Sequence, residues 1–146
     1  MIDSAEERIG HRRTVLVGDL NMNPFEAGVV GAAGLNATMV RNQARKELRV
    51  VQGNKYRFFY NPMWRYFGDG QAAPPGTYYY DNHEHVTYYW NLFDQVLVRP
   101  DLISNLDAGD LEIVQRIGAI SLLDHEGIPN QLIGSDHLPL LFSLRF

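Results

Sequence analysis

Two short apolar segments that lie far apart in the sequence most constrain what this chain can fold into. The first, 14–17, is rich in β-branched residues and runs into Gly18; the second, 95–98, directly follows Asp94. Segments of this length and composition are typical of strands that are buried in a sheet. Because an acidic residue lies beside an end of each segment, the sequence predicts carboxylates at the ends of two buried strands.

The rest of the chain carries more strand signals than helix signals, and they do not alternate as regular βαβ units. We expect helices over 3–11, 25–34 and 38–48, and a long loop over 61–76, where glycine and proline gather. Besides the first segment, we expect strands over these ranges: 49–52, 56–60, 77–80, 86–89, 94–98, 111–117 and 138–146. The pattern predicts an α+β fold, in which a mixed β-sheet is flanked by helices.

The composition indicates a single domain over 1–146. The chain has 146 residues, of which 45% are hydrophobic, and a formal net charge of -4. It has no cysteine, which excludes a disulfide scaffold, a thiolate metal site and a cysteine nucleophile. No apolar segment reaches the ~18 residues of a transmembrane helix, so we expect no membrane span. Residues 1–14 are polar, unlike a secretory signal, which favours a cytoplasmic location.

Asp19 and Asn21 follow the first predicted strand, directly after Gly18. If the chain stays extended there, the two side chains point to the same side. Together they supply one anionic acceptor and one neutral donor and acceptor, which suits an attacking water and a phosphate oxygen. The alternative is a simple Asx turn, because both residue types form turns after strands.

Asp94, Asp136 and His137 complete the candidate chemistry. Asp94 lies between bulky apolar residues, so we expect it to be partly buried and to need a partner. The natural partner is a histidine, which a carboxylate orients and makes more basic; the alternative is a backbone cap at the strand start. Asp136 and His137 can bind a metal or exchange protons, although such a pair is also common on surfaces.

Three motifs, in this order along the chain, carry a resemblance to a known family: VGDLNMNP around Asp19, DQVLV from Asp94, and GSDHLPLL around His137. The chain resembles the endonuclease/exonuclease/phosphatase superfamily, which has the deoxyribonuclease I-like fold. The resemblance implies about half of a four-layer α/β sandwich, with this chain as the C-terminal portion of the domain. It also implies metal-dependent hydrolysis of phosphodiester or phosphomonoester bonds by water attack.

The resemblance implies a role for each residue at a matching position. His137 is expected to be the general base or acid, and Asp94 the carboxylate that orients it. Asp19 would position or deprotonate the attacking water, and Asn21 would hold a phosphate oxygen. Asp136 is expected to bind Mg²⁺ or Mn²⁺, since hard cations prefer carboxylate oxygens.

The family pattern normally begins with further strands, which carry an Asn and a metal-binding Glu. Only eighteen residues precede Asp19, so these elements do not fit here. We therefore expect a fragment whose partner is the missing N-terminal half of the domain, with incomplete activity alone, rather than a truncated product that another chain completes. An apolar sheet face is then expected to be exposed, and the chain to self-associate through it.

The sequence leaves the substrate and a second class of function open. The phosphate ester could belong to DNA, RNA, a lipid or a small molecule. The alternative function is a catalytically inactive binding or assembly module derived from the same fold. The chain has neither a GxxxxGK[ST] loop nor a GxSxG motif, which excludes a P-loop enzyme and an α/β-hydrolase.

Other features have a structural and a functional interpretation. The basic cluster 41–57 could follow a phosphate backbone or form a solvated face. All but three of the aromatic residues lie within 56–93, where they could stack on bases or sugars or simply pack a core. Within that stretch, 61–64 and 76–78 are the candidates for a substrate-side loop. The segment 83–85 could contribute two histidines to a zinc site, but it has no identifiable third ligand and is expected to be a surface hairpin.

Overall fold

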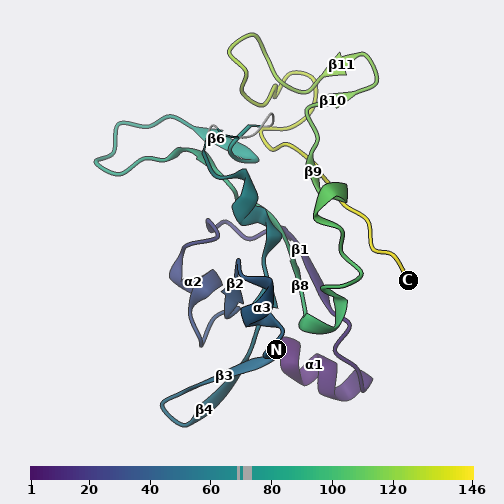
Figure 1. The fold of residues 1–146 in the computed structure, drawn as a ribbon. Helices are drawn as coiled ribbons and strands as arrows, with labels where there is room; N and C mark the ends of the chain where they lie inside the picture. Colours follow the sequence, from purple (N-terminus) through teal and green to yellow (C-terminus); the bar gives the residue numbers. More distant parts are fainter. Residues whose placement is uncertain (69, 71–73) are drawn as a thin grey trace.

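The computed structural model describes residues 1–68, 70 and 74–146, and its centre is a four-stranded mixed sheet with the strand order β1-β8-β5-β2 (Figure 1). The strands are β1 (Val15–Asp19), β8 (Asp94–Val98), β5 (Phe59–Tyr60) and β2 (Ala37–Thr38). Both neighbours of β8 run antiparallel to it, and β2 is parallel to β5. The predicted α+β class with a mixed sheet is therefore confirmed.

The two apolar segments that the sequence singled out are the longest pair in this sheet. β1 and β8 form an antiparallel ladder that runs from Val15 opposite Val98 to Asp19 opposite Asp94. Side chains alternate between the faces of a strand, so a shift of one residue would place every apolar side chain on the wrong face. The register thus determines which of the two core clusters each apolar side chain of β8 enters.

β8 is covered by core on both of its faces. Val96 and Val98 belong to the larger core cluster on one face, and Leu97 packs with Phe59 in a smaller cluster on the other. The exposed apolar side chain of this sheet is on the edge strand β1, where Val17 is 52% exposed. The expected exposed sheet face is therefore limited to this edge, and self-association stays a prediction.

In the described part of the chain, four smaller two-stranded sheets surround the central one. They pair β3 (Leu48–Val51) with β4 (Asn54–Arg57), β6 (Tyr78–Tyr80) with β7 (Tyr89–Asn91), β9 (Glu112–Ile113) with β12 (Leu140–Leu141), and β10 (Arg116–Ile117) with β11 (Ile120–Ser121). In Figure 1, α1 (Ile2–Ile9) and the β3–β4 hairpin lie at one end of the central sheet, and β6 lies at the other.

Two predicted helices are much shorter than expected. The helix predicted over 25–34 is limited to α2 (Ala27–Val30), because a run of glycines folds the chain back on itself. A side chain at Gly31 or Gly34 would meet a backbone carbonyl at 2.4 or 2.2 Å, so these glycines allow a turn tighter than a helix. The helix predicted over 38–48 is limited to α3 (Arg41–Ala44), since Ala37–Thr38 joins the central sheet as β2.

The strand predictions fail mainly in the last third of the chain. The strand expected over 111–117 is divided between β9 and β10, and the one over 138–146 is reduced to β12. The strand expected over 86–89 lies instead at β7, and 61–76 contains the short 3-10 helix Pro62–Tyr66. Part of that predicted loop, residues 69 and 71–73, lies outside the described residues. Two further 3-10 turns are Pro100–Leu102 and Ala108–Asp110.

An ion-pair cluster fastens α1 to the end of β8. The guanidinium of Arg99, which is 3% exposed, donates from Nε to Glu6 Oε1 at 2.8 Å and from Nη2 to Asp3 Oδ1 at 2.5 Å. Burial alone would raise the pKa of Glu6, but the hydrogen bonds from Arg99 and Thr14 and the charge of Arg99 outweigh it, so this pKa lies below its ordinary value of 4.5. None of the helices in the described part of the chain is both long enough and apolar enough to span a membrane.

We predict that Glu6→Gln lowers the free energy of unfolding by about 1–2 kcal/mol near neutral pH, because Arg99 loses a buried ionic partner. The folded-state pKa of Glu6 is lowered, so its contribution is present above pH 4.5 and is lost as the pH falls through the folded-state value. Urea unfolding across this range measures it. The exposed neighbour provides the control: Glu7→Gln should match the wild type, and a Glu6→Gln deficit that persists unchanged in acid would contradict the prediction.

Candidate functional site

The three predicted acidic segments meet at one end of the central sheet. Asp19 is the last residue of β1 and lies directly opposite Asp94, the first residue of β8. His137, from the segment before β12, lies against Asp94. Like charges placed directly opposite each other destabilise an antiparallel pair, so each of the two carboxylates needs a compensating partner.

Asp94 and His137 form a hydrogen-bonded dyad. His137 Nδ1 lies 2.7 Å from Asp94 Oδ2, and the two side chains are 25% and 20% exposed. Since a carboxylate can only accept, we assign the proton to Nδ1, which leaves the lone pair on Nε2. The predicted histidine partner of Asp94 is therefore present, and the imidazole is held in the tautomer that a general base requires.

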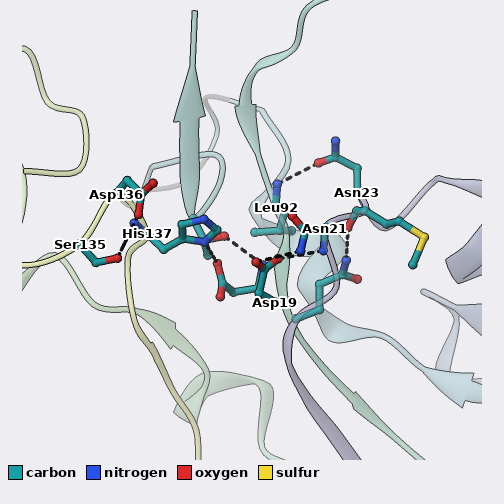
Figure 2. A network of polar contacts seen from close by, with 11 residues as sticks. Asp19, Asn21, Asn23, Leu92, Ser135, Asp136 and His137 are labelled. Carbon is teal, nitrogen blue, oxygen red and sulfur yellow. Dashed lines mark hydrogen bonds and ion pairs between the residues drawn. The ribbon is translucent and has the colours of Figure 1, made fainter. Parts of the chain in front are cut away.

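The Asp19 carboxylate accepts two hydrogen bonds from Asn21, two residues further along the chain. Asp19 Oδ1 accepts from the backbone nitrogen of Asn21 at 2.8 Å, and Asp19 Oδ2 accepts from Asn21 Nδ2 at 3.1 Å. Asn21 has a φ of 49°, a left-handed conformation that asparagine tolerates better than most residues. The Asx turn that the sequence left open is thus present, and Figure 2 shows Asp19 between Asn21 and His137.

Thr77 holds both members of the dyad from the backbone side. Its hydroxyl accepts from the backbone nitrogen of Asp94 at 3.1 Å, and its carbonyl accepts from Leu138, the residue after His137, at 2.8 Å. Thr77 is fully buried. A side chain at Gly76 would lie 2.5 Å from the carbonyl oxygen of Asn91, so only glycine lets the chain approach closely enough to place Thr77 here.

The Asp136 side chain lies apart from the other candidate side chains and, among the residues that the structure describes, forms no hydrogen bond or ion pair with them. Its carboxylate is exposed, and Asp136 Oδ1 lies 3.3 Å from the hydroxyl of Ser135. Figure 2 shows Asp136 and Asp19 on opposite sides of the His137 ring. Within the described ranges, no group of three Asp, Glu, His or Cys side chains could hold a metal ion. Hard cations take about six oxygen ligands, so the residues present do not fit Mg²⁺ or Mn²⁺ by themselves.

A buried amide network, which the sequence analysis missed, fixes the chain beyond Asp19. Asn61 Nδ2 donates to Gln95 Oε1 at 2.7 Å, and Gln95 Nε2 donates to the carbonyl of Met22 at 2.6 Å. Asn23, which is 1% exposed, accepts from the backbone nitrogen of Leu92 at 2.8 Å. The signal that could have found this network is the polar Gln95 inside an otherwise apolar strand.

The remaining sequence candidates lie elsewhere or serve the core. Residues 61–63 of the candidate substrate loop are buried, whereas 76–78 of the second candidate adjoins the dyad. In the basic cluster, Arg41 and Arg49 bond to the hydroxyl of Tyr60 and the carbonyl of Val30. Its β3–β4 hairpin lies at the sheet end away from β6 (Figure 1). The segment 83–85 forms no strand, and no zinc ligand group includes it in the described part of the chain.

Comparison of the chain with family models, with curated proteins and with solved structures finds no match in any of the three. The resemblance to the endonuclease/exonuclease/phosphatase superfamily therefore depends on the three motifs alone. What the structure adds is their convergence at one end of the β1–β8 ladder.

We predict that Thr77→Val lowers the free energy of unfolding by about 1 kcal/mol, because valine keeps the shape but leaves the backbone nitrogen of Asp94 without its acceptor. Thermal unfolding measures the change. Thr87→Val is the matched control, since Thr87 is only partly buried and should stay within about 0.5 kcal/mol of the wild type. Equal unfolding free energies for the two variants would contradict the anchoring role of Thr77.

Proposed function

We propose that this chain is a phosphoesterase, or the part of one, that hydrolyses phosphodiester or phosphomonoester bonds by water attack. The observation that carries the proposal is the His137–Asp94 dyad, with Nδ1 and Oδ2 2.7 Å apart, directly across the ladder from Asp19. Two opposed carboxylates cost stability at a strand end. Such a local conflict is expected where function rather than folding selects the residues.

The proposed step uses four side chains. His137 Nε2 accepts a proton from a water molecule that Asp19 orients, while the water oxygen bonds to phosphorus and the ester P–O bond breaks. The leaving oxygen then takes the proton from the imidazolium, which the Asp94 carboxylate stabilises. Asn21 donates one amide hydrogen to Asp19 and has a second for a phosphate oxygen.

The fold and the metal belong to the same proposal. The order of the three motifs supports the central sheet as part of a deoxyribonuclease I-like sandwich, of which this chain would be the C-terminal portion. The resemblance supports a requirement for Mg²⁺ or Mn²⁺, with Asp136 as one ligand. Since Asp136 alone cannot hold such an ion, the step above is assigned to His137, Asp94, Asp19 and Asn21 only.

We predict that the wild type hydrolyses bis(p-nitrophenyl) phosphate or p-nitrophenyl phosphate, and that kcat/KM falls by roughly 10³-fold in His137→Ala. Asp94→Asn should lower it by roughly 10²-fold, because an amide no longer stabilises the imidazolium and can favour the wrong tautomer. Release of p-nitrophenol is followed with Mn²⁺, with Mg²⁺ and with a chelator.

The controls are His125→Ala and Asp101→Asn, which replace exposed residues of the same types away from the site and should leave the rate unchanged. Hydrolysis that is equally fast in His137→Ala would place the chemistry elsewhere. If the wild type hydrolyses neither ester under any of the three conditions, the chain is not a phosphoesterase by itself. The same assay on a longer chain that includes the missing N-terminal half then distinguishes a half-enzyme, which gains activity, from an inactive binding or assembly module, which does not.

A further inference from the structure

We propose that a groove beside the dyad binds a nucleobase, so that the substrate is a nucleoside phosphoester; the position of its phosphate rests on the function proposed above. This groove, which we call the tyrosine groove, has a volume of about 310 Å³. That volume is at the lower end of the roughly 300–1,000 Å³ of small-molecule sites. Its principal lining residues are Asn21, Tyr78, Tyr80, Asn82, Tyr88 and Phe93.

The tyrosine groove is continuous with the candidate catalytic residues. Asn21, which binds the Asp19 carboxylate, forms part of its wall. Tyr78, another wall residue, places its ring 4.7 Å from the imidazole of His137. Phe93 is the residue directly before Asp94. A ligand that places its phosphate at His137 can therefore extend into the groove without leaving the protein surface.

Three rings of the wall form a nearly parallel series. Tyr80 and Tyr78 lie 6.2 Å apart with 14° between their planes, and Tyr78 and Phe93 lie 5.5 Å apart with 20° between theirs. Tyr80, at the outer end, is 51% exposed. An exposed aromatic ring at the end of such a series offers a flat surface on which a base can stack.

The polar groups of the groove suit an uncharged ring with hydrogen-bonding edges. Four asparagines line it: Asn21, Asn23, Asn82 and Asn91. Asn23 and Asn91 are buried and bonded to each other. The donors and acceptors for a ligand therefore come from Asn21 and Asn82. The one charged residue among its described lining is Glu26, an acid that accepts from the backbone nitrogen of Asn23 at 2.7 Å. Since none of the described lining residues is a cation, a second phosphate is disfavoured, which points to a base of a mononucleotide ester rather than a polyanionic backbone.

Tyr89 provides a matched control on the same hairpin. It is the cross-strand partner of Tyr80 and is similarly exposed, at 49%. However, its φ of 59° is unusual for a bulky residue, and its ring lies 6.5 Å from Tyr79 rather than in the groove. Replacing either tyrosine by alanine therefore uncovers a similar hairpin surface, but only the replacement of Tyr80 removes the proposed stacking surface.

The test is the binding of thymidine 5′-monophosphate to the whole chain in chelator, followed by NMR, with ribose 5-phosphate as the probe without a base. We expect the nucleotide to bind more tightly than ribose 5-phosphate in the wild type. Tyr80→Ala should raise the Kd for the nucleotide about tenfold, and Tyr89→Ala should leave it unchanged. Equal affinity for the two probes, or an unchanged Kd in Tyr80→Ala, would overturn the inference.

A hydrolysis assay separates this inference from the proposed function. Thymidine 5′-(p-nitrophenyl phosphate) should be cleaved with a higher kcat/KM than methyl p-nitrophenyl phosphate. Equal cleavage of both esters would overturn the groove as a substrate subsite and leave the phosphoesterase standing. Cleavage of neither, together with Tyr80-dependent nucleotide binding, would support the groove as a base-binding site and contradict phosphoesterase activity of this chain by itself.

Discussion

The antiparallel pairing of β1 with β8 determines the positions of Asp19 and Asp94, the two carboxylates that the asparagine and the histidine of the candidate site contact. Its register places Asp19 opposite Asp94, and its alternation directs Val96 and Leu97 into cores on opposite faces. A slip of one residue would move the carboxylates apart and exchange the cores that Val96 and Leu97 enter. The burial of apolar side chains, which take no part in the proposed chemistry, therefore sets the geometry of the polar site.

A second layer of support comes from buried polar residues around this ladder. Thr77 receives hydrogen bonds from the two chain segments that carry Asp94 and His137, and Gln95 connects the core to the loop after Asp19. Buried groups of this kind are costly unless every partner is present. The site is thus held by groups that tolerate little rearrangement, which suits a function that depends on distances of a few ångströms.

The parts of this architecture that could be predicted from the sequence are those with a local signal. The apolar segments ending at Gly18 and starting at Asp94 identified two strands of the central sheet, and the expected burial of Asp94 indicated a histidine partner. The predicted burial is correct for β8 but wrong for β1, which is an edge strand with no buried residue. The short helices and the divided strands of the last third were missed, because glycine contacts and long-range pairing override local pattern. Thr77 and the tyrosine groove were also missed as such, since they arise from contacts between distant segments.

The distance between β1 and β8 along the chain has a consequence for how the protein folds. More than half of the sequence separates the two strands, so the entropy of closing a long loop must be overcome before the central ladder can form. Until the ladder closes, the β-branched segment of β1 has no strand with which to pair. Even in the folded state β1 is an edge strand with Val17 exposed. The strand whose pairing requires the long loop to close is therefore also a strand that another chain can pair with, before and after folding.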